Sequence, residues 1–365
     1  MAVCFIFLLA FCCDMCYTTV ENFLIKEILM NICILGSGTW GMALAMLLKN
    51  NEHTVKVWSA IPEEIELLKS SGTHKNLPGV VFPSGIDYTT DMEYAIDGAE
   101  MVLYVVPSQF IRATAKRSAQ YLKDGIILAN AAKGIEPGTL MTLTEVISDE
   151  VDKAKPSLDY KICALSGPTH AEEVARGLPT SIVSACEDEE TSFRIAKVFA
   201  NSCMRVYANT DLRGVEVAGA LKNIIALAAG INRGMGFGDN SAAMLMTRGI
   251  AEITRMGIAL GCNPATFRGL AGIGDLIVTC SSRHSRNNRC GELVGRGMSY
   301  EEASREIGMV VEGYHALTAA IELSERYGVE MPITRAVDNV LNKGQTVKEA
   351  MLSLMNRDLK NELIL

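Results

Sequence analysis

The amino-acid sequence predicts an N-terminal α/β domain built on a Rossmann-like, doubly wound sheet, followed by an all-α C-terminal domain. From Asn31 to about Thr210, short apolar or β-branched runs alternate with helical patterns, an order typical of a parallel sheet covered by helices. After Asp211, long stretches rich in Ala, Leu, Met and Gly replace these runs and indicate helices alone. We therefore expect an extension over residues 1–29, a Rossmann-like α/β domain over 30–210 and an all-helical domain over 211–365.

The first expected strand and helix flank a glycine-rich turn. The apolar run 32–35 comes directly before Gly36-Ser37-Gly38-Thr39-Trp40-Gly41, and the helical run 42–48 follows. In a dinucleotide-binding βαβ unit the first glycine permits the tight turn, the second lets the backbone approach a pyrophosphate, and the third lets helix and strand pack closely. The helix N-terminus then offers free N–H groups to the phosphates. This pattern predicts a site for a nicotinamide or flavin nucleotide.

The other strands of the sheet are expected in six apolar runs, at Thr54–Trp58, Met101–Val106, Gly125–Asn130, Ile162–Leu165, Ser181–Ser184 and Met204–Tyr207. Several of the later runs end in polar or glycine-containing turns, at 107–109, 132–134 and 166–169. Open α/β sheets bind ligands at the carboxyl ends of their strands. These turns are therefore expected to lie at the ligand site.

Length, charge and cysteine usage limit the class of protein. A chain of 365 residues is long enough for two domains. The net charge of -8 argues against general binding to nucleic acid or a membrane surface, since either needs a basic face. The 11 cysteines are scattered and lack the Cys/His spacing of a zinc site. Reduced, buried thiols in a cytoplasmic protein, with no metal, are the expectation.

Residues 1–29 differ from the rest of the chain. The run from Val3 to Cys13 is almost wholly apolar, yet no Lys or Arg precedes it and no clear small-residue cleavage site follows. It is also too short to span a bilayer, which needs ~20 residues, so no stable membrane insertion is expected. Because Met30 stands directly before the first strand, we interpret 1–29 as an extension from a mis-chosen start codon. An export signal or anchor is the alternative.

Lys222 stands in the run 217–227, which is apolar on nearly every face of a helix. Burial of an ammonium group is unfavourable unless the group is paired or its pKa falls. A lysine with a lowered pKa can serve as a general acid/base near neutral pH. The alternative is that its side chain reaches the surface. Glu216 is either a partner of this lysine or a solvated residue.

Three other segments carry groups suited to a substrate. Lys133 lies in a turn after the run 126–130. It is either a cation that binds a carbonyl or phosphate oxygen or a solvated loop lysine. Asp275 stands alone in a glycine-rich apolar stretch, with a helix cap as its alternative role. The segment Ser285-Arg286-Asn287 offers a planar cation beside two hydrogen-bonding side chains. It suits a substrate phosphate, with an exposed basic loop as the alternative.

The end of the second strand leaves the choice between NAD and NADP open. An NAD site usually has Asp or Glu there, about 20 residues after the glycines, and an NADP site has Arg. Here the sequence is Trp58-Ser59-Ala60, followed by Glu63 and Glu64. Either glutamate could reach the ribose, but both are expected in the first turn of a helix that begins at Pro62.

Taken in order, these segments resemble the bacterial type of NAD(P)-dependent sn-glycerol-3-phosphate dehydrogenase. The resemblance runs from about Met30 to near the C-terminus. Besides the glycine turn it rests on Val106-Pro107-Ser108-Gln109, Lys133-Gly134-Ile135-Glu136, Ser166-Gly167-Pro168-Thr169, Gly219-Ala220-Leu221-Lys222-Asn223, Gly274-Asp275-Leu276, Ser285-Arg286-Asn287 and Val311-Glu312-Gly313.

The resemblance implies interconversion of sn-glycerol 3-phosphate and dihydroxyacetone phosphate with NAD or NADP, in a homodimer that serves phospholipid synthesis. It implies that Lys222 is the general acid/base. Substrate binding is implied for Lys133, Gly167, Thr169, Lys222, Asn223, Asp275, Ser285, Arg286 and Asn287. Cofactor contact is implied for Gly36, Gly38, Thr39, Trp40, Gly41, Lys133, Ala171, Arg286, Val310 and Glu312.

Two positions depart from the family pattern. Ala60 stands where a basic residue often supports NADP, and His170 stands where we expect an aromatic ring and is interpreted as a packing variation. Two other functions stay open: a related hydroxy-acid dehydrogenase, which would need a carboxylate receptor, and a catalytically silent dinucleotide sensor. Lys133, Lys222 and Asp275 argue against the sensor, because a sensor needs no proton-transfer lysine.

Overall fold

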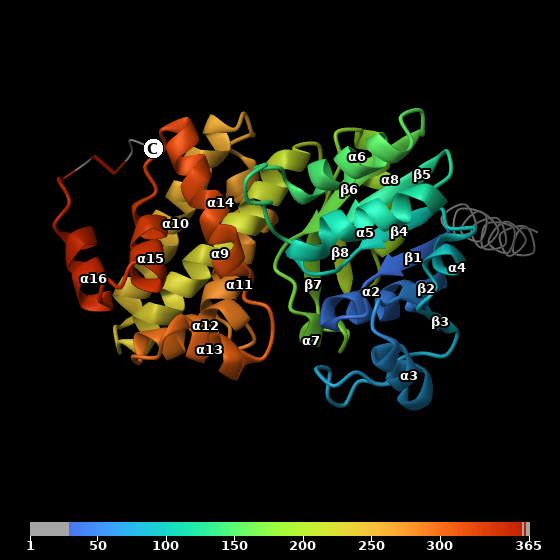
Figure 1. Ribbon diagram of the computed structural model, residues 1–365, viewed down its shortest axis with the longest axis horizontal. Helices are drawn as coiled ribbons and strands as arrows, with labels where there is room; N and C mark the ends of the chain where they lie inside the picture. Colours follow the sequence, from blue (N-terminus) through green and yellow to red (C-terminus); the bar gives the residue numbers. More distant parts are fainter. Residues whose placement is uncertain (1–28, 360, 363–365) are drawn as a thin grey trace, which may run out of the picture.

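The computed structural model describes residues 29–359, 361 and 362, which form an α/β part and a helical part lying side by side (Figure 1). The interpretation of residues 1–29 as an extension falls almost entirely outside the described residues. The last strand ends at Asn209 and the first long helix begins at Leu212. All described elements beyond Asn209 are helical.

Eight strands form one sheet in the order β3-β2-β1-β4-β5-β6-β7-β8. The order runs outward from β1 in both directions, which confirms the doubly wound arrangement. The central strands β4 and β5 are buried along their whole length and therefore need helices on both faces. The strands are β1 (Asn31–Leu35), β2 (Thr54–Trp58), β3 (Ile86–Thr89), β4 (Met101–Tyr104), β5 (Ile126–Asn130), β6 (Tyr160–Ser166), β7 (Thr180–Ala185) and β8 (Met204–Asn209).

Two features of the sheet differ from the prediction. Strand β7 runs antiparallel to β6, so the sheet is not parallel throughout. The β6–β7 connection contains only the one-turn helix α7 (Ala171–Val174), whereas a parallel crossover usually contains a full helix. Strand β3 was not predicted, because its four residues Ile-Asp-Tyr-Thr form no distinct apolar run.

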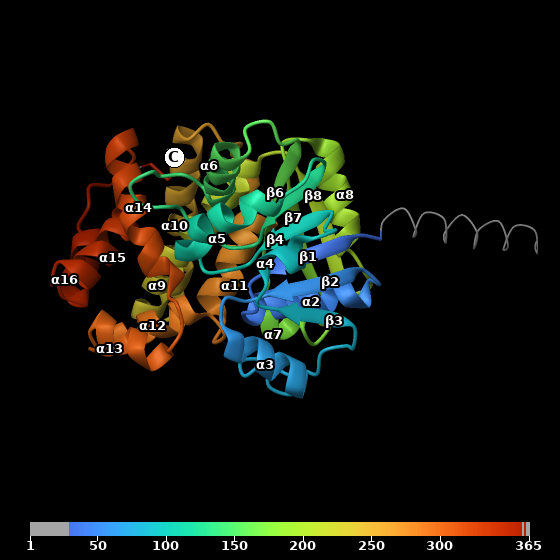
Figure 2. The same cartoon turned by 45° about the vertical axis from the view of Figure 1, so that its right-hand side comes forward.

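Side chains alternate between the two faces of the sheet, and each face has its own core. In β1, Ile32 and Ile34 pack with helix α2, whereas Cys33 and Leu35 pack with α4, α5 and α6. Figure 2 shows helices on either side of the sheet. Besides α7, the α-helices of this part are α2 (Thr39–Asn50), α3 (Pro62–Ser71), α4 (Met92–Ile96), α5 (Ile111–Ser118), α6 (Leu143–Ala154) and α8 (Glu189–Phe199).

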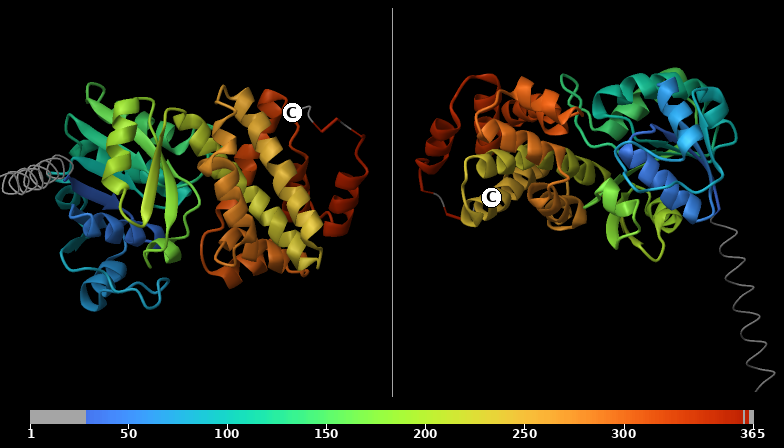
Figure 3. Two further views of the ribbon diagram at one scale, coloured as in Figure 1. Left: turned by 180° about the vertical axis from the view of Figure 1, so that it is seen from behind. Right: turned by 90° about the horizontal axis from the view of Figure 1, so that it is seen from below.

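Helix α9 (Leu212–Gly234) is the central element of the helical part, and α10, α11, α12 and α14 contact it (Figure 3). It is long and apolar enough to cross a membrane, but its apolar stretch is 100% buried inside the protein, as in the core helix of a helical domain. The surrounding helices are α10 (Asp239–Ala259), α11 (Asp275–Ser281), α12 (Arg286–Gly295), α13 (Tyr300–Ile307), α14 (Glu312–Tyr327), α15 (Pro332–Asn342) and α16 (Val347–Met355).

Glu216 connects the first helix of the helical part to the α/β part. Its carboxylate accepts hydrogen bonds from Asn130 Nδ2 at 3.1 Å, from the backbone N of Thr144 at 3.0 Å, and from the Thr144 hydroxyl. Burial raises the pKa of this carboxyl group above its usual value. Both predictions for Glu216 were wrong, because it is neither solvated nor paired with Lys222. Instead it holds α9 against the first turn of α6.

The described cysteines agree with the expectation of buried thiols. Seven lie in the described part of the chain as free thiols, and all except Cys203 are buried. Burial raises the pKa of most of them, Cys262 and Cys280 for example to about 12. Neutral thiols of this kind react poorly, so these residues act as small apolar core residues.

Candidate active site

The glycine turn between β1 and α2 has the geometry that a dinucleotide phosphate needs. Gly36 has a φ of 128°, and a Cβ on Gly41 would lie 2.1 Å from the carbonyl oxygen of Gly36. A Cβ on Gly38 would meet nothing within 4 Å, so this side of the turn is open. Helix α2 has no side-chain cap and no acid in its first turn, and the buried Thr39 Oγ1 has no hydrogen-bond partner. These free donors fit a pyrophosphate.

Three charged side chains from distant segments meet where the α/β and helical parts are in contact. Asp275 Oδ1 lies 2.8 Å from Lys222 Nζ, and Asp275 Oδ2 lies 2.6 Å from Lys133 Nζ. Lys222 comes from the middle of α9, Lys133 from the turn after β5, and Asp275 from the start of α11. Asp275 is 1% exposed and Lys222 is 5% exposed. The alternatives of a surface-reaching Lys222, a solvated Lys133 and a helix-capping Asp275 were therefore wrong.

The environment of Lys222 lowers the pKa of its ammonium group to about 8. Burial is the main cause, and the nearby charge of Lys133 acts in the same direction, while Asp275 opposes the shift. Lys222 Nζ also donates to the hydroxyl of Thr279, and that hydroxyl donates to the backbone oxygen of Asp275 at 2.6 Å. Thr279 was not predicted. Its position four residues after Asp275, on the same helix face, was the available signal.

Lys133 is also held by the turn after β6. Its Nζ donates to the backbone oxygen of Gly167 at 3.1 Å, and Thr169 Oγ1 donates to the same oxygen at 3.2 Å. Gly167 has a φ of 152°, and a Cβ there would lie 3.1 Å from Ile182 Cα. Ala171 opens the short helix that follows this turn.

The segment predicted to receive a phosphate begins helix α12. Asn287 donates to Asn223 Oδ1 at 2.9 Å and accepts from the backbone N of Gly313 at 2.9 Å, so these groups are paired inside the helical part. Ser285 is the N-cap of α12 and accepts from the backbone N of Asn288. Arg286 is exposed, and within the described chain it has no recorded hydrogen bond or ion pair. Its guanidinium is therefore available to an anion.

Two further contacts join the α/β and helical parts around the site. The carboxylate of Glu312 accepts from the backbone N of Ser108 at 3.2 Å and from its hydroxyl at 2.5 Å, and Val310 lies just before it in the turn that opens α14. His170 faces His284, with ring centroids 5.7 Å apart. Burial lowers the pKa of His170, so its ring is neutral near pH 7 and adds no positive charge.

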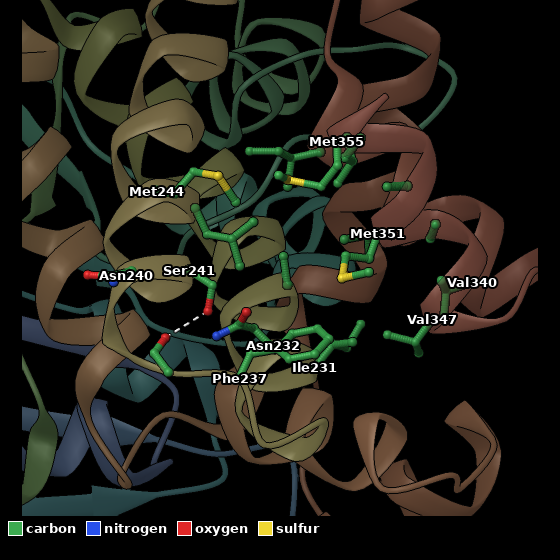
Figure 4. Close-up of a pocket in the computed structure, with 18 of the residues that line it drawn as sticks. Ile231, Asn232, Phe237, Asn240, Ser241, Met244, Val340, Val347, Met351 and Met355 are labelled. Carbon is green, nitrogen blue, oxygen red and sulfur yellow. Dashed lines mark hydrogen bonds between the residues drawn. The ribbon is translucent and has the colours of Figure 1, made fainter. Parts of the chain in front are cut away.

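A separate apolar cavity of about 930 Å³ lies between α9, α10, α15 and α16 (Figure 4). It is lined mainly by aliphatic, methionine and phenylalanine side chains, among them Phe237, Met244 and Met351. Among the described residues that line it, Asp239 alone is charged, so these residues offer no cation to a phosphate. The chemistry of the site therefore belongs to the Lys133–Asp275–Lys222 cluster.

A dinucleotide turn in the α/β part, together with a buried lysine of lowered pKa in the helical part, is typical of the class of two-domain nicotinamide-dependent dehydrogenases. Within this class, the chain belongs to the NAD-dependent glycerol-3-phosphate dehydrogenase family. The family model for the N-terminal domain matches residues 31–192, and the model for the C-terminal domain matches residues 211–352.

Individual relatives agree with the family assignment. A glycerol-3-phosphate dehydrogenase [NAD(P)+] of Lactobacillus delbrueckii subsp. bulgaricus is 52% identical over 332 residues, 91% of this chain and 98% of the relative. Its counterpart in Enterococcus faecalis is 46% identical over 91% of this chain and 97% of the relative. The crystal structure of glycerol-3-phosphate dehydrogenase from Coxiella burnetii superimposes with a TM-score of 0.85 at 32% identity, over 90% of this chain and 100% of that one.

Proposed function

We propose that the protein interconverts sn-glycerol 3-phosphate and dihydroxyacetone phosphate with NAD or NADP, and that Lys222 moves the proton. The observation that supports this most directly is the buried Lys222–Asp275 pair, 2.8 Å apart, at the junction of the two domains. A structural ion pair alone does not explain why Lys133 joins the same carboxylate from a third segment. Two ammonium groups close together favour loss of a proton from the more buried one.

In the proposed mechanism, Lys222 removes the C2 hydroxyl proton of glycerol 3-phosphate, or returns it to the ketone oxygen of dihydroxyacetone phosphate. The nicotinamide ring, when bound, accepts or supplies the hydride. Asp275 orients Lys222 and Lys133, and Lys133 polarises the same oxygen of the substrate. Gly167 and Thr169 fix the turn that holds Lys133.

The phosphate of the substrate is bound by Arg286, with Ser285, Asn287 and Asn223 beside it. Contacts to this remote group contribute binding energy that orients C2 for reaction. On the cofactor side, the pyrophosphate is held by the glycine turn, through Gly36, Gly38, Thr39, Trp40 and Gly41. Further contacts to the cofactor come from Ala171, Val310 and Glu312. The protein acts as a cytoplasmic homodimer that supplies glycerol 3-phosphate for phospholipid synthesis.

The function is tested by mixing purified protein with dihydroxyacetone phosphate and following the loss of NADH or NADPH absorbance in parallel. We expect rapid oxidation with at least one cofactor, and none with 2- or 3-keto acids. Cofactor binding without oxidation by dihydroxyacetone phosphate would contradict the proposal. In that case a keto acid that is reduced would indicate a hydroxy-acid dehydrogenase, and no turnover at all would indicate the dinucleotide sensor.

The two reaction directions are expected to have opposite pH dependences around pH 8. Oxidation of glycerol 3-phosphate needs the neutral amine of Lys222, whose pKa is lowered to about 8, so kcat/KM rises with pH and levels above that value. Reduction of the ketone needs the ammonium form, so its kcat/KM falls above the same pH. Initial rates in both directions at constant ionic strength provide the measurement. Parallel profiles in the two directions would exclude Lys222 as the titrating group.

A further inference from the structure

The carboxylate of Glu64 lies at the end of strand β2, where the sequence has no acid. Glu64 belongs to the first turn of α3, which begins at Pro62 as expected. Its Oε2 accepts from the hydroxyl of Ser59, the residue after β2, at 2.9 Å and from the hydroxyl of Ser37, in the glycine turn, at 2.6 Å. Ser37 is 2% exposed and Ser59 is 5% exposed, so both anchors are fixed parts of the fold.

These contacts bring a carboxylate to the end of β2 from helix α3, whereas the usual acid belongs to the strand itself. In most NAD sites an Asp or Glu at the end of the second strand accepts from a ribose hydroxyl. Here the small residues Ser59 and Ala60 follow the strand, and a glutamate from the next helix reaches back to the same point. The hydroxyl of Ser59 also accepts from the backbone N of Ile61, which fixes the direction of its own donor hydrogen toward Glu64.

The second oxygen of the same carboxylate is available for a ligand. Both serine hydroxyls donate to Oε2, and no donor to Oε1 is recorded among the described residues. Glu64 is partly exposed, so Oε1 can meet a bound group without opening the core. A carboxylate oxygen of this kind accepts a hydrogen bond from a hydroxyl but repels a phosphate.

The surroundings do not cancel the negative charge of Glu64. Within the described residues, no lysine or arginine forms an ion pair with it. His74 is close enough to interact electrostatically, but burial lowers the pKa of His74 and keeps the imidazole neutral near pH 7. A 2′-phosphate at this position would therefore meet an uncompensated carboxylate.

We infer that Glu64 selects NAD over NADP, by accepting a hydrogen bond from the adenosine ribose and repelling a 2′-phosphate. The inference rests on the proposed function for the use of a nicotinamide cofactor, and it adds which of the two cofactors the site takes. Ala60 and Ser59 then act by being small, because they leave room for the glutamate of α3 at the end of β2.

The test compares equilibrium binding of NADH and NADPH, measured by calorimetry on the full chain without substrate. The wild-type protein is expected to bind NADH at least about tenfold more tightly than NADPH, as one charge-assisted hydrogen bond and one like-charge contact imply. Glu64→Gln keeps the size and the acceptor but removes the charge. This variant is expected to reduce the preference for NADH, measured as the ratio of the NADPH to the NADH dissociation constant, at least about fivefold. The change should come mainly from tighter NADPH binding.

The matched control is Glu63→Gln, which makes the same change one residue earlier in α3 on an exposed side chain. It is expected to leave the ratio unchanged, since it alters the helix charge equally but lies outside the contacts to Ser37 and Ser59. Thermal unfolding checks that both variants fold. The comparison of NADH and NADPH affinity in the wild-type protein does not depend on a variant and tests the inference by itself. Equal affinities in the wild type, or the same ratio in Glu64→Gln and Glu63→Gln, would overturn the inference.

Failure of this inference is distinguishable from failure of the proposed function. Oxidation of NADH or NADPH by dihydroxyacetone phosphate tests the reaction, whichever cofactor binds better. A protein that reduces dihydroxyacetone phosphate with equal affinity for both cofactors would retain the function and lose the role of Glu64. A protein that binds NADH selectively through Glu64 but does not reduce dihydroxyacetone phosphate would retain the role of Glu64 and lose the proposed function.

Discussion

Alanine in place of Lys222 is expected to lower kcat/KM in both directions by about a thousandfold or more, the contribution of a general acid/base at its upper range. NADH affinity should stay unchanged, because the glycine turn lies in the other domain. The variant should also fold, since Asp275 keeps its pair with Lys133 at 2.6 Å. Stopped-flow turnover with calorimetric NADH binding provides the measurement. Near-normal turnover by Lys222→Ala would contradict the proposed role of Lys222 in proton transfer.

The variant Lys222→Arg distinguishes proton transfer by Lys222 from an effect of its positive charge alone. Arginine keeps a positive charge beside Asp275, but its guanidinium does not lose a proton at any working pH. We therefore expect Lys222→Arg to be as inactive in the oxidation direction as Lys222→Ala. Small primary amines should partly restore turnover to the alanine variant alone, with rates that follow the pKa of the amine. Activity in the arginine variant would mean that Lys222 acts only as a fixed charge.

The sequence contained most of the information on the fold, because strand and helix periods are local properties. The glycine turn, the helix start at Pro62 and the change of composition after residue 210 could all be found from neighbouring residues. The direction of β7 could not, since a buried strand has the same composition whether it runs parallel or antiparallel to its neighbour. Strand β3 could not be found either, because its four residues form no distinct apolar run.

The candidate site was predicted residue by residue but not as a set of contacts. Lys133 and Asp275 are 142 residues apart, and the local sequence around either residue does not indicate that the two side chains form a pair. The same holds for Glu216, whose partners Asn130 and Thr144 lie in the other domain. Glu64 is the clearest case: its helical position was predicted correctly, but its contacts with Ser37 and Ser59 depend on how α3 folds back over β2.

Asp275→Asn is expected to reduce both stability and activity, because it leaves Lys222 and Lys133 without their shared anion. Asp275 is 1% exposed, and loss of one partner of a buried ion pair typically costs about 3–5 kcal/mol of unfolding free energy. The side chain of Lys133 is 18% exposed, so water offsets part of that cost. Turnover should fall about a hundredfold or more, within the range for a misplaced reactive group. Urea unfolding and steady-state rates measure the two losses.

The pH profile distinguishes a positioning role for Asp275 from a purely structural one. Asp275 favours the charged form of Lys222, against the effects of burial and of Lys133, so its removal should lower the pKa of Lys222 below the present value of about 8. The rise of kcat/KM for glycerol 3-phosphate oxidation should then move to lower pH, in the residual activity of Asp275→Asn. Asp239→Asn removes an exposed acid from the same domain and should move neither stability nor the profile. A less stable Asp275→Asn variant whose profile keeps its midpoint would mean that this carboxylate holds the domains together without tuning Lys222.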